Sequence, residues 1–206
     1  MTNLDKANEL IVKIALLIAF CDDEFHDSES KIIKNWIEKK TKGLTEQNRT
    51  KLKNSYEIAL EKSIKSIKSN DSNITDLCLE LLSLGPQMYN FDALELSIEI
   101  MTADNLIHPN EVKLIYQLAK ILKISNKDVV EIIDKSILGM SQIPKSIDVE
   151  GLLKIEPTVS NIEADKAFQK TFVKWNHLTT SASTDIQRKI SQKMLDVTSD
   201  VGDKYT

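Results

Sequence analysis

Glycine and proline are scarce in this chain, which has five glycines and four prolines among its 206 residues. Few positions can therefore form the tight turns that join the strands of an all-β sandwich or barrel. Hydrophobic residues make up 41% and charged residues 28% of the sequence, which is ordinary for a protein that buries a core. The shortage of turn residues, together with abundant Leu, Ile, Lys and Glu, predicts an all-α protein.

Cysteine is rarer still, since the chain has only Cys21 and Cys78, each inside an apolar helical pattern. No CxxC pair or Cys/His cluster with zinc-site spacing occurs, so we expect both thiols to be reduced and buried. The apolar run from Ile11 to Phe20 contains Lys13 and is about half as long as the ~20 residues that span a membrane. We therefore expect neither a secretory signal nor a membrane span, and we expect a cytoplasmic protein.

Motifs of common enzymes are also missing. The sequence contains no Gly-rich phosphate loop, no Gly-x-Ser-x-Gly and no His-Glu-x-x-His. Glu24 and His26 stand at the wrong spacing for the Glu-x-x-His of a di-iron carboxylate bundle. We expect a protein that is not an enzyme.

Charge is distributed unevenly along the chain. Residues 31–68 hold eleven Lys/Arg against four Asp/Glu, whereas residues 71–134 hold four Lys against eleven Asp/Glu. These stretches either present an anion-attracting and a cation-attracting side or are simply solvated helix faces. Because the basic stretch has only two aromatic residues, and the chain has a net charge of −4, we expect no nucleic-acid binding.

The chain repeats a short motif at an offset of 82 residues. Cys21-Asp-Asp-Glu-Phe-His-Asp-Ser-Glu29 aligns with Ala103-Asp-Asn-Leu-Ile-His-Pro-Asn-Glu111, and each copy lies between two apolar runs of helical period. The equivalent positions are Asp22/Asp104, Asp23/Asn105, Phe25/Ile107, His26/His108 and Glu29/Glu111. Each copy therefore predicts a helix–turn–helix corner, in which Asp23 and Asn105 suit a left-handed turn position.

Pro109 sets the frame of the second corner, because proline is favoured at the first position of a helix. His108 is then the N-cap, and Glu111 is the third helical residue, whose carboxylate can reach back to the cap as in a capping box. By alignment, His26 and Glu29 hold the same places in the first corner. Both corners are thus predicted to begin a new helix in the same way.

Periodicity and caps predict about seven helices between residues 5 and 138, with no strand among them. The repeat relates the two halves, so helices 5–21 and 27–41 should superpose on 91–103 and 109–122. The fold class is therefore an internally duplicated all-α bundle.

After residue 138 the composition changes, with four Gly and Pro residues before residue 161 and then two amphipathic segments, 163–178 and 185–201. The predicted divisions are a duplicated helical domain (1–140), a linker (141–161) and a C-terminal helical hairpin (162–206). A lone hairpin buries too little surface to be stable, so it must dock on the module, dimerise or meet a partner.

The repeated corner resembles the signature of TerB-like domains, which reads approximately Ala-Asp-Gly-x-(apolar)-x-x-x-Glu between two helices and occurs twice in the fold. The matching positions are Asp22 and Asp104 for the aspartate and Glu29 and Glu111 for the glutamate. Asp23 and Asn105 stand where the family has glycine. The resemblance covers roughly residues 5–138 and implies a non-enzymatic protein of bacterial stress or tellurite resistance, with divalent-cation binding and a place in membrane-linked assemblies.

Asp22, Glu29, Asp104 and Glu111 are candidate ligands of a divalent cation, with Ca²⁺ favoured because a hard cation takes several carboxylate oxygens. Each corner alone offers too few oxygens, so a joint site needs the Asp22 and Asp104 carboxylates within ~10 Å of each other. Alternatively, the glutamates satisfy helix N-termini and the aspartates cap or solvate the corners. The two cap histidines are either transition-metal ligands or local hydrogen-bonding groups.

Phe168, Phe172 and Trp175 are the candidate partner-binding residues, because their spacing aligns them on one helix face. We expect the hairpin's second helix and the module, or another chain, to cover them. Two functions follow. The first is a TerB-like module that binds a divalent cation within a stress assembly; the second is a metal-independent helical adaptor that binds a protein through its surface and hairpin. The resemblance implies that the partner protein is membrane-associated.

Overall fold

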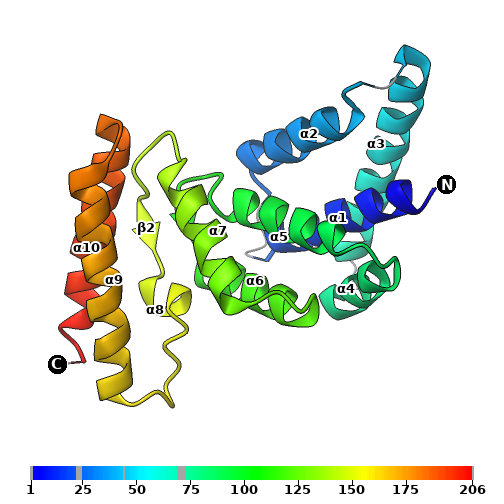
Figure 1. Cartoon of the computed structure of the whole chain (residues 1–206). Coiled ribbons are helices and arrows are strands. Elements are labelled where there is room, and N and C mark those ends of the chain that lie inside the picture. The colour runs from blue at the N-terminus through cyan, green and yellow to red at the C-terminus, as the bar shows by residue number, and fades with distance from the viewer. Residues whose placement is uncertain (1, 22–24, 44, 69–72, 206) are drawn as a thin grey trace.

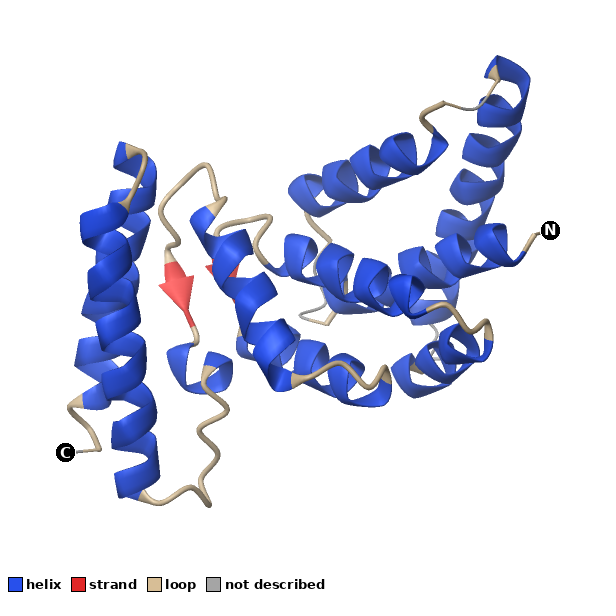
Figure 2. Cartoon of the chain, viewed as in Figure 1, coloured by secondary structure: helices blue, strands red, loops and turns tan. Residues whose placement is uncertain are grey.

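The computed structural model describes residues 2–21, 25–43, 45–68 and 73–205 of the chain. This part is mostly helical and contains ten α-helices, which confirms the all-α class (Figure 2). The helices are α1 (Asn3–Ala19), α2 (Asp27–Thr41), α3 (Glu46–Lys68), α4 (Ile74–Ser83), α5 (Gln87–Met101), α6 (Pro109–Ile121), α7 (Asn126–Leu138), α8 (Val149–Leu152), α9 (Asn161–Ser181) and α10 (Asp185–Gly202). Helices α1 to α7 fall in the segment for which about seven helices are predicted.

Helix α1 is the centre of the core. Ile11, Ile14, Leu16 and Ile18 are all fully buried, because α3, α4, α5 and α6 pack around α1. A helix that is apolar on nearly every face is stable only when it is surrounded in this way. Among the residues described, no helix combines the length and the apolar character needed to cross a membrane.

Helices α2 and α3 form an arm on one side of this core. Figure 1 shows α2 lying over α5 and α3 rising to the top of the molecule. The turn after α2 contains Gly43, whose φ of 91° is in the left-handed region that glycine adopts without strain. The Lys40 ammonium bonds the Asp92 carboxylate at 2.6 Å, which ties α2 to α5.

Two short strands depart from the prediction that residues 5–138 contain no strand. Strand β1 (Leu106–Ile107) pairs in parallel with β2 (Ser146–Ile147), which lies outside that segment. The N-cap His108 is itself in the extended conformation and directly follows β1, whose backbone groups need partners outside a helix. The chain after α7 supplies them, since the Lys145 N–H also donates to the Asn105 carbonyl at 2.8 Å.

The predicted linker 141–161 packs along the module. Ile147, Val149 and Leu152 are buried, and the last two lie in the short helix α8. The Tyr116 hydroxyl of α6 donates to the Leu152 carbonyl at 2.6 Å. The linker therefore contributes side chains to the core.

The predicted hairpin is present, with α9 and α10 packed along each other and against α7 and α8 (Figure 1). The Lys174 ammonium of α9 bonds the Asp134 carboxylate of α7 at 2.7 Å. The Tyr205 hydroxyl donates to the Glu150 carboxylate at 2.6 Å, and its ring stacks on Phe168 with centroids 5.2 Å apart. These contacts bind the hairpin to the rest of the chain at both ends.

Candidate functional site

The first corner joins α1 to α2. Helix α1 ends at Phe20, whose N–H donates to the Leu16 carbonyl at 3.0 Å, and the Phe25 ring stacks on Phe20 with centroids 4.9 Å apart. His26 is the N-cap of α2, and the Glu29 carboxylate accepts a hydrogen bond from the His26 N–H at 2.7 Å. The predicted cap and capping glutamate are confirmed here. Residues 22–24, including the candidate ligand Asp22, lie outside the described residues.

The second corner joins α5 to α6. Asp104 accepts a hydrogen bond from the Leu106 N–H at 2.9 Å, and Asn105 has a φ of 66°, which confirms the predicted left-handed turn position. His108 is the N-cap of α6, and the Glu111 carboxylate accepts from the His108 N–H at 3.3 Å. The side chains at this corner are thus used in the way that helix capping requires.

Backbone angles are closely alike at the described helix caps on either side of the two turns. The residues that end α1 and α5, Phe20 and Thr102, have φ/ψ of −97°/9° and −98°/3°. The N-caps His26 and His108 have φ/ψ of −85°/149° and −83°/138°. Each pair is separated by the 82 residues of the sequence repeat.

The two corners also face each other in space. The Nε2 atom of His26 lies 3.9 Å from a carboxylate oxygen of Asp104, and both side chains are partly open to solvent. The pair attracts only when the imidazole is protonated, and at this distance the attraction is weak. The contact matters because His26 belongs to one corner and Asp104 to the other, so it shows that the two corners lie close together.

Three of the four predicted cation ligands lie within the described residues. Glu29 and Glu111 are buried, and each binds the N–H of its cap histidine, while Asp104 binds the Leu106 N–H. Within the described ranges, no three His, Cys, Asp or Glu side chains come together closely enough to hold a metal ion. Because Asp22 lies outside those ranges, the four-carboxylate site and its 10 Å criterion stay predictions.

The cap histidine of the second corner has a local partner. The Nδ1 atom of His108 accepts a hydrogen bond from the Asn110 N–H at 3.3 Å. This is the hydrogen-bonding role that the sequence offers as the alternative to metal ligation.

The three candidate partner-binding aromatics have different environments. Phe168 is 3% exposed and Trp175 is 0% exposed, so both belong to the core between the hairpin and the module. Phe172 is 39% exposed, and its neighbour Val173 is 68% exposed. Of the predicted three, only Phe172 presents a substantial surface to a partner.

Val173 borders a largely apolar groove of about 830 Å³ between α7 and the hairpin. Leu138 and Leu178 line the same groove, with Lys135 and His177 among its polar residues. The sequence analysis misses this surface, because Leu138 and Val173 belong to helices far apart in the chain. The only sequence signal is the position of Val173 directly beside the predicted aromatic stripe.

Comparisons with known proteins return no relatives. None of the protein-family models matches this chain, and no curated protein or solved structure is significantly similar to it.

Proposed function

We propose that the chain is a non-enzymatic TerB-like module, internally duplicated between residues 5 and 138, that acts in the bacterial cytoplasm within a stress or tellurite-resistance assembly. The observation that carries the proposal is the pair of corners, whose caps have like backbone angles at the spacing of the sequence repeat. Disrupting the gene should make its host more sensitive to tellurite, and a plasmid copy should restore growth. A disrupted strain that grows like its parent under tellurite and other stresses would contradict this role.

Cation binding is supported by the facing of the two corners. The 3.9 Å approach of His26 to Asp104 brings the N-cap of the first corner next to the turn of the second. A hard cation between the corners would draw on carboxylate oxygens, with Asp22, Glu29, Asp104 and Glu111 as the proposed set. Glu29 and Glu111 would then both cap a helix and face the ion.

Calorimetric titration of Ca²⁺, Zn²⁺ and Mn²⁺ into chelator-treated protein tests this binding. Asp104→Asn keeps an oxygen for the Leu106 N–H and removes the charge, so it should weaken Ca²⁺ binding about tenfold or more. Asp128→Asn is the matched control, because Asp128 is a helix-capping acid away from both corners. If Ca²⁺ does not bind at concentrations below ~1 mM, or if the Asp104→Asn and Asp128→Asn variants bind it equally well, the acids of the corners serve only to cap helices.

Protein binding is supported by a separate observation, the apolar groove between α7 and the hairpin. Concave, mostly apolar surfaces are where proteins take up apolar groups, and here Val173 is 68% exposed at the edge of the groove. As an adaptor the chain would use this groove, with Phe172 beside it, to hold an apolar side chain of its partner.

The adaptor role is tested by pairing two substitutions on α9. Val173→Asp places a charge at the groove, whereas Ile162→Asp places one at an equally exposed position, 69% open to solvent, that does not line the groove. In pull-downs from the host, Val173→Asp should lose the partner and Ile162→Asp should keep it. Equal capture by both variants would show that the partner binds elsewhere.

A further inference from the structure

A second groove runs along the inner side of α2, toward α3, α5 and α7. Its two parts, of about 620 Å³ and 500 Å³, adjoin at Ile32 and Glu99, which line both of them. The first part lies between α2 and α3, and the second between α5 and α7. The groove is built from helices that the sequence places up to about a hundred residues apart.

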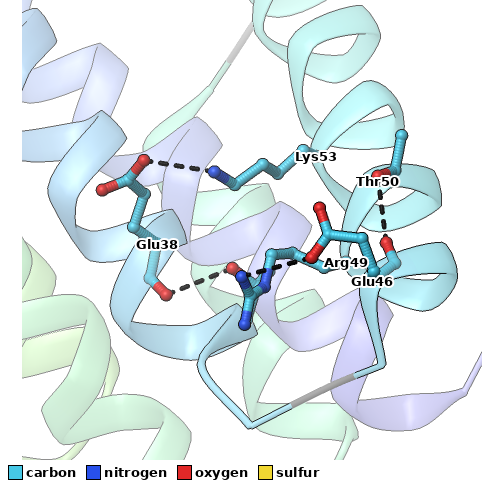
Figure 3. Close-up of polar contacts among 6 residues, drawn as sticks. Glu38, Glu46, Arg49, Thr50 and Lys53 are labelled. Carbon is cyan, nitrogen blue, oxygen red and sulfur yellow. Dashed lines mark hydrogen bonds and ion pairs between the residues drawn. The ribbon is translucent and has the colours of Figure 1, made fainter.

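Uncompensated cations lie at the α2–α3 end of this groove. Figure 3 shows Lys53 of α3 paired with Glu38 of α2, and Arg49 paired with Glu46. The N···O distances of these pairs are 3.1 Å and 3.5 Å. Lys39 and Lys42 also line this end, are exposed, and form no ion pair with a described residue. The ammonium groups of these two lysines are thus available to an anionic partner.

Uncompensated acids lie on the α5 wall. Glu95 and Glu99 are one turn apart, exposed, and without an ion pair to any described residue. Asp92, one turn earlier on α5, is by contrast paired with Lys40 at 2.6 Å. Counting every lining residue, the first part has four Lys/Arg against two Glu, and the second has two Glu against Lys135. The net charge is therefore positive at one end of the groove and negative further along.

Apolar side chains form the surface between these charges. Ile32, Ile98, Ile132 and Met140 line the second part of the groove, with Ile98 and Met140 buried and the other two half-buried. A groove in which two half-buried isoleucines lie between charged edges fits a segment that is apolar on one face and charged on its sides.

We propose that this groove binds an amphipathic helix of a protein partner, with acidic residues in its first turn against Lys39 and Lys42 and basic residues further along against Glu95 and Glu99. The bound segment is a helix because the walls are helices, whose own backbone groups are already paired and cannot pair with an extended strand. A helix also prefers acids in its first turn and bases in its last, which sets its direction antiparallel to α2. The C-terminal end of α2 then faces the N-terminal end of the partner helix, an arrangement that favours both dipoles.

The proposal is independent of cation binding and concerns a different surface from the apolar α7–hairpin groove, although the two grooves meet at Lys135 and Gly139. The probes are two synthetic labelled peptides of about 18 residues with the same composition and the same i, i+3, i+4, i+7 leucines. One carries Glu in its first turn and Lys in its last, and the other has these charges exchanged. Fluorescence anisotropy with the full chain should show the first binding about tenfold more tightly, with the difference shrinking at high salt.

Charge-reversal variants locate the site. Lys39→Glu with Lys42→Glu should weaken the first peptide about tenfold and strengthen the second. Lys31→Glu with Lys34→Glu is the matched control, because both lysines are exposed on the same helix but do not line the groove. Val173→Asp should leave both affinities unchanged, so a loss there would assign the peptide to the α7–hairpin groove and overturn the proposal.

Other outcomes also overturn it. These are equal binding of the two peptides, no binding of either up to ~1 mM, or an equal loss in the control variant. A dimer in light scattering that the Lys39→Glu, Lys42→Glu variant disperses would identify the occupant as a second copy of this chain instead.

Discussion

Truncating Trp175 should undock the hairpin. The indole is 0% exposed and borders a small internal space of about 20 Å³, together with Tyr116 of α6, Ile133 of α7, Leu152 of α8 and Met194 of α10. Five helices therefore meet at this ring. Trp175→Ala removes the whole indole from that junction.

The expected loss in the free energy of unfolding is ~3–5 kcal/mol, which is typical when a buried aromatic is cut to alanine. Because whole domains are stable by only ~5–15 kcal/mol, this is a large fraction of the total. Trp175→Phe is the matched control. The indole N–H has no hydrogen-bond partner in the described structure, so phenylalanine loses no bond and should cost ~1 kcal/mol.

Urea titration followed by far-UV circular dichroism measures the loss, and hydrogen exchange shows where it falls. Protection should drop first in α9 and α10 of the alanine variant. A loss below ~1 kcal/mol for Trp175→Ala would mean that the hairpin is not anchored by this ring. Equal losses for alanine and phenylalanine would show that packing of the ring does not account for the loss.

Three more variants or reactions probe other parts of the chain. Burial raises the pKa of Asp134, although Lys174 lowers it in part, so ionisation costs stability as pH rises through that pKa. Asp134→Asn should therefore gain stability relative to the wild type in urea titrations between pH ~3 and ~7, and the opposite trend would show that the ion pair outweighs desolvation. Burial raises the pKa of the Cys78 thiol to about 12, so this thiol should resist a disulfide reagent until the protein unfolds, whereas the half-buried Cys21 reacts sooner; equal rates would contradict this. Asn105 has a φ of 66°, so Asn105→Gly should leave thermal stability equal or higher, and Asn105→Val should cost ~1–2 kcal/mol; equal melting temperatures would refute the strain.

A truncated chain that lacks the hairpin tests whether the module folds by itself. Removal of the hairpin at residue 162 takes away Phe168 and Trp175 and uncovers Tyr116 and Leu152. We expect the module to remain folded but to lose stability, since α1 and α5 bury their side chains without the hairpin. Circular dichroism of the truncated chain should still show a cooperative helical transition. Complete unfolding would make the hairpin part of one core.

The helices and their caps were predictable from the sequence because they depend on residues close together in the chain. Pro109 sets the start of α6, and His108 and Glu111 then satisfy the backbone N–H groups of its first turn. Gly43 and Asn105 mark left-handed turns for the same local reason. Periodicity alone likewise separates the two hairpin helices from the linker before them.

Only the tertiary structure decided which residues of different helices meet. The approach of His26 to Asp104 depends on how α2 lies across α5, and the pairing of β1 with β2 depends on the path of the chain after α7. Neither contact leaves a periodic signal, because long-range packing joins positions whose spacing in sequence is arbitrary.

The aromatic stripe of α9 shows the same limit. Periodicity places Phe168, Phe172 and Trp175 on one face, yet the helices around α9 cover the first and last rings and leave Phe172 and Val173 open. Hydrophobic period says which side of a helix prefers to be buried, and the neighbouring helices determine how much of that side they cover. The surfaces proposed here for partner binding are the parts that those neighbours leave exposed.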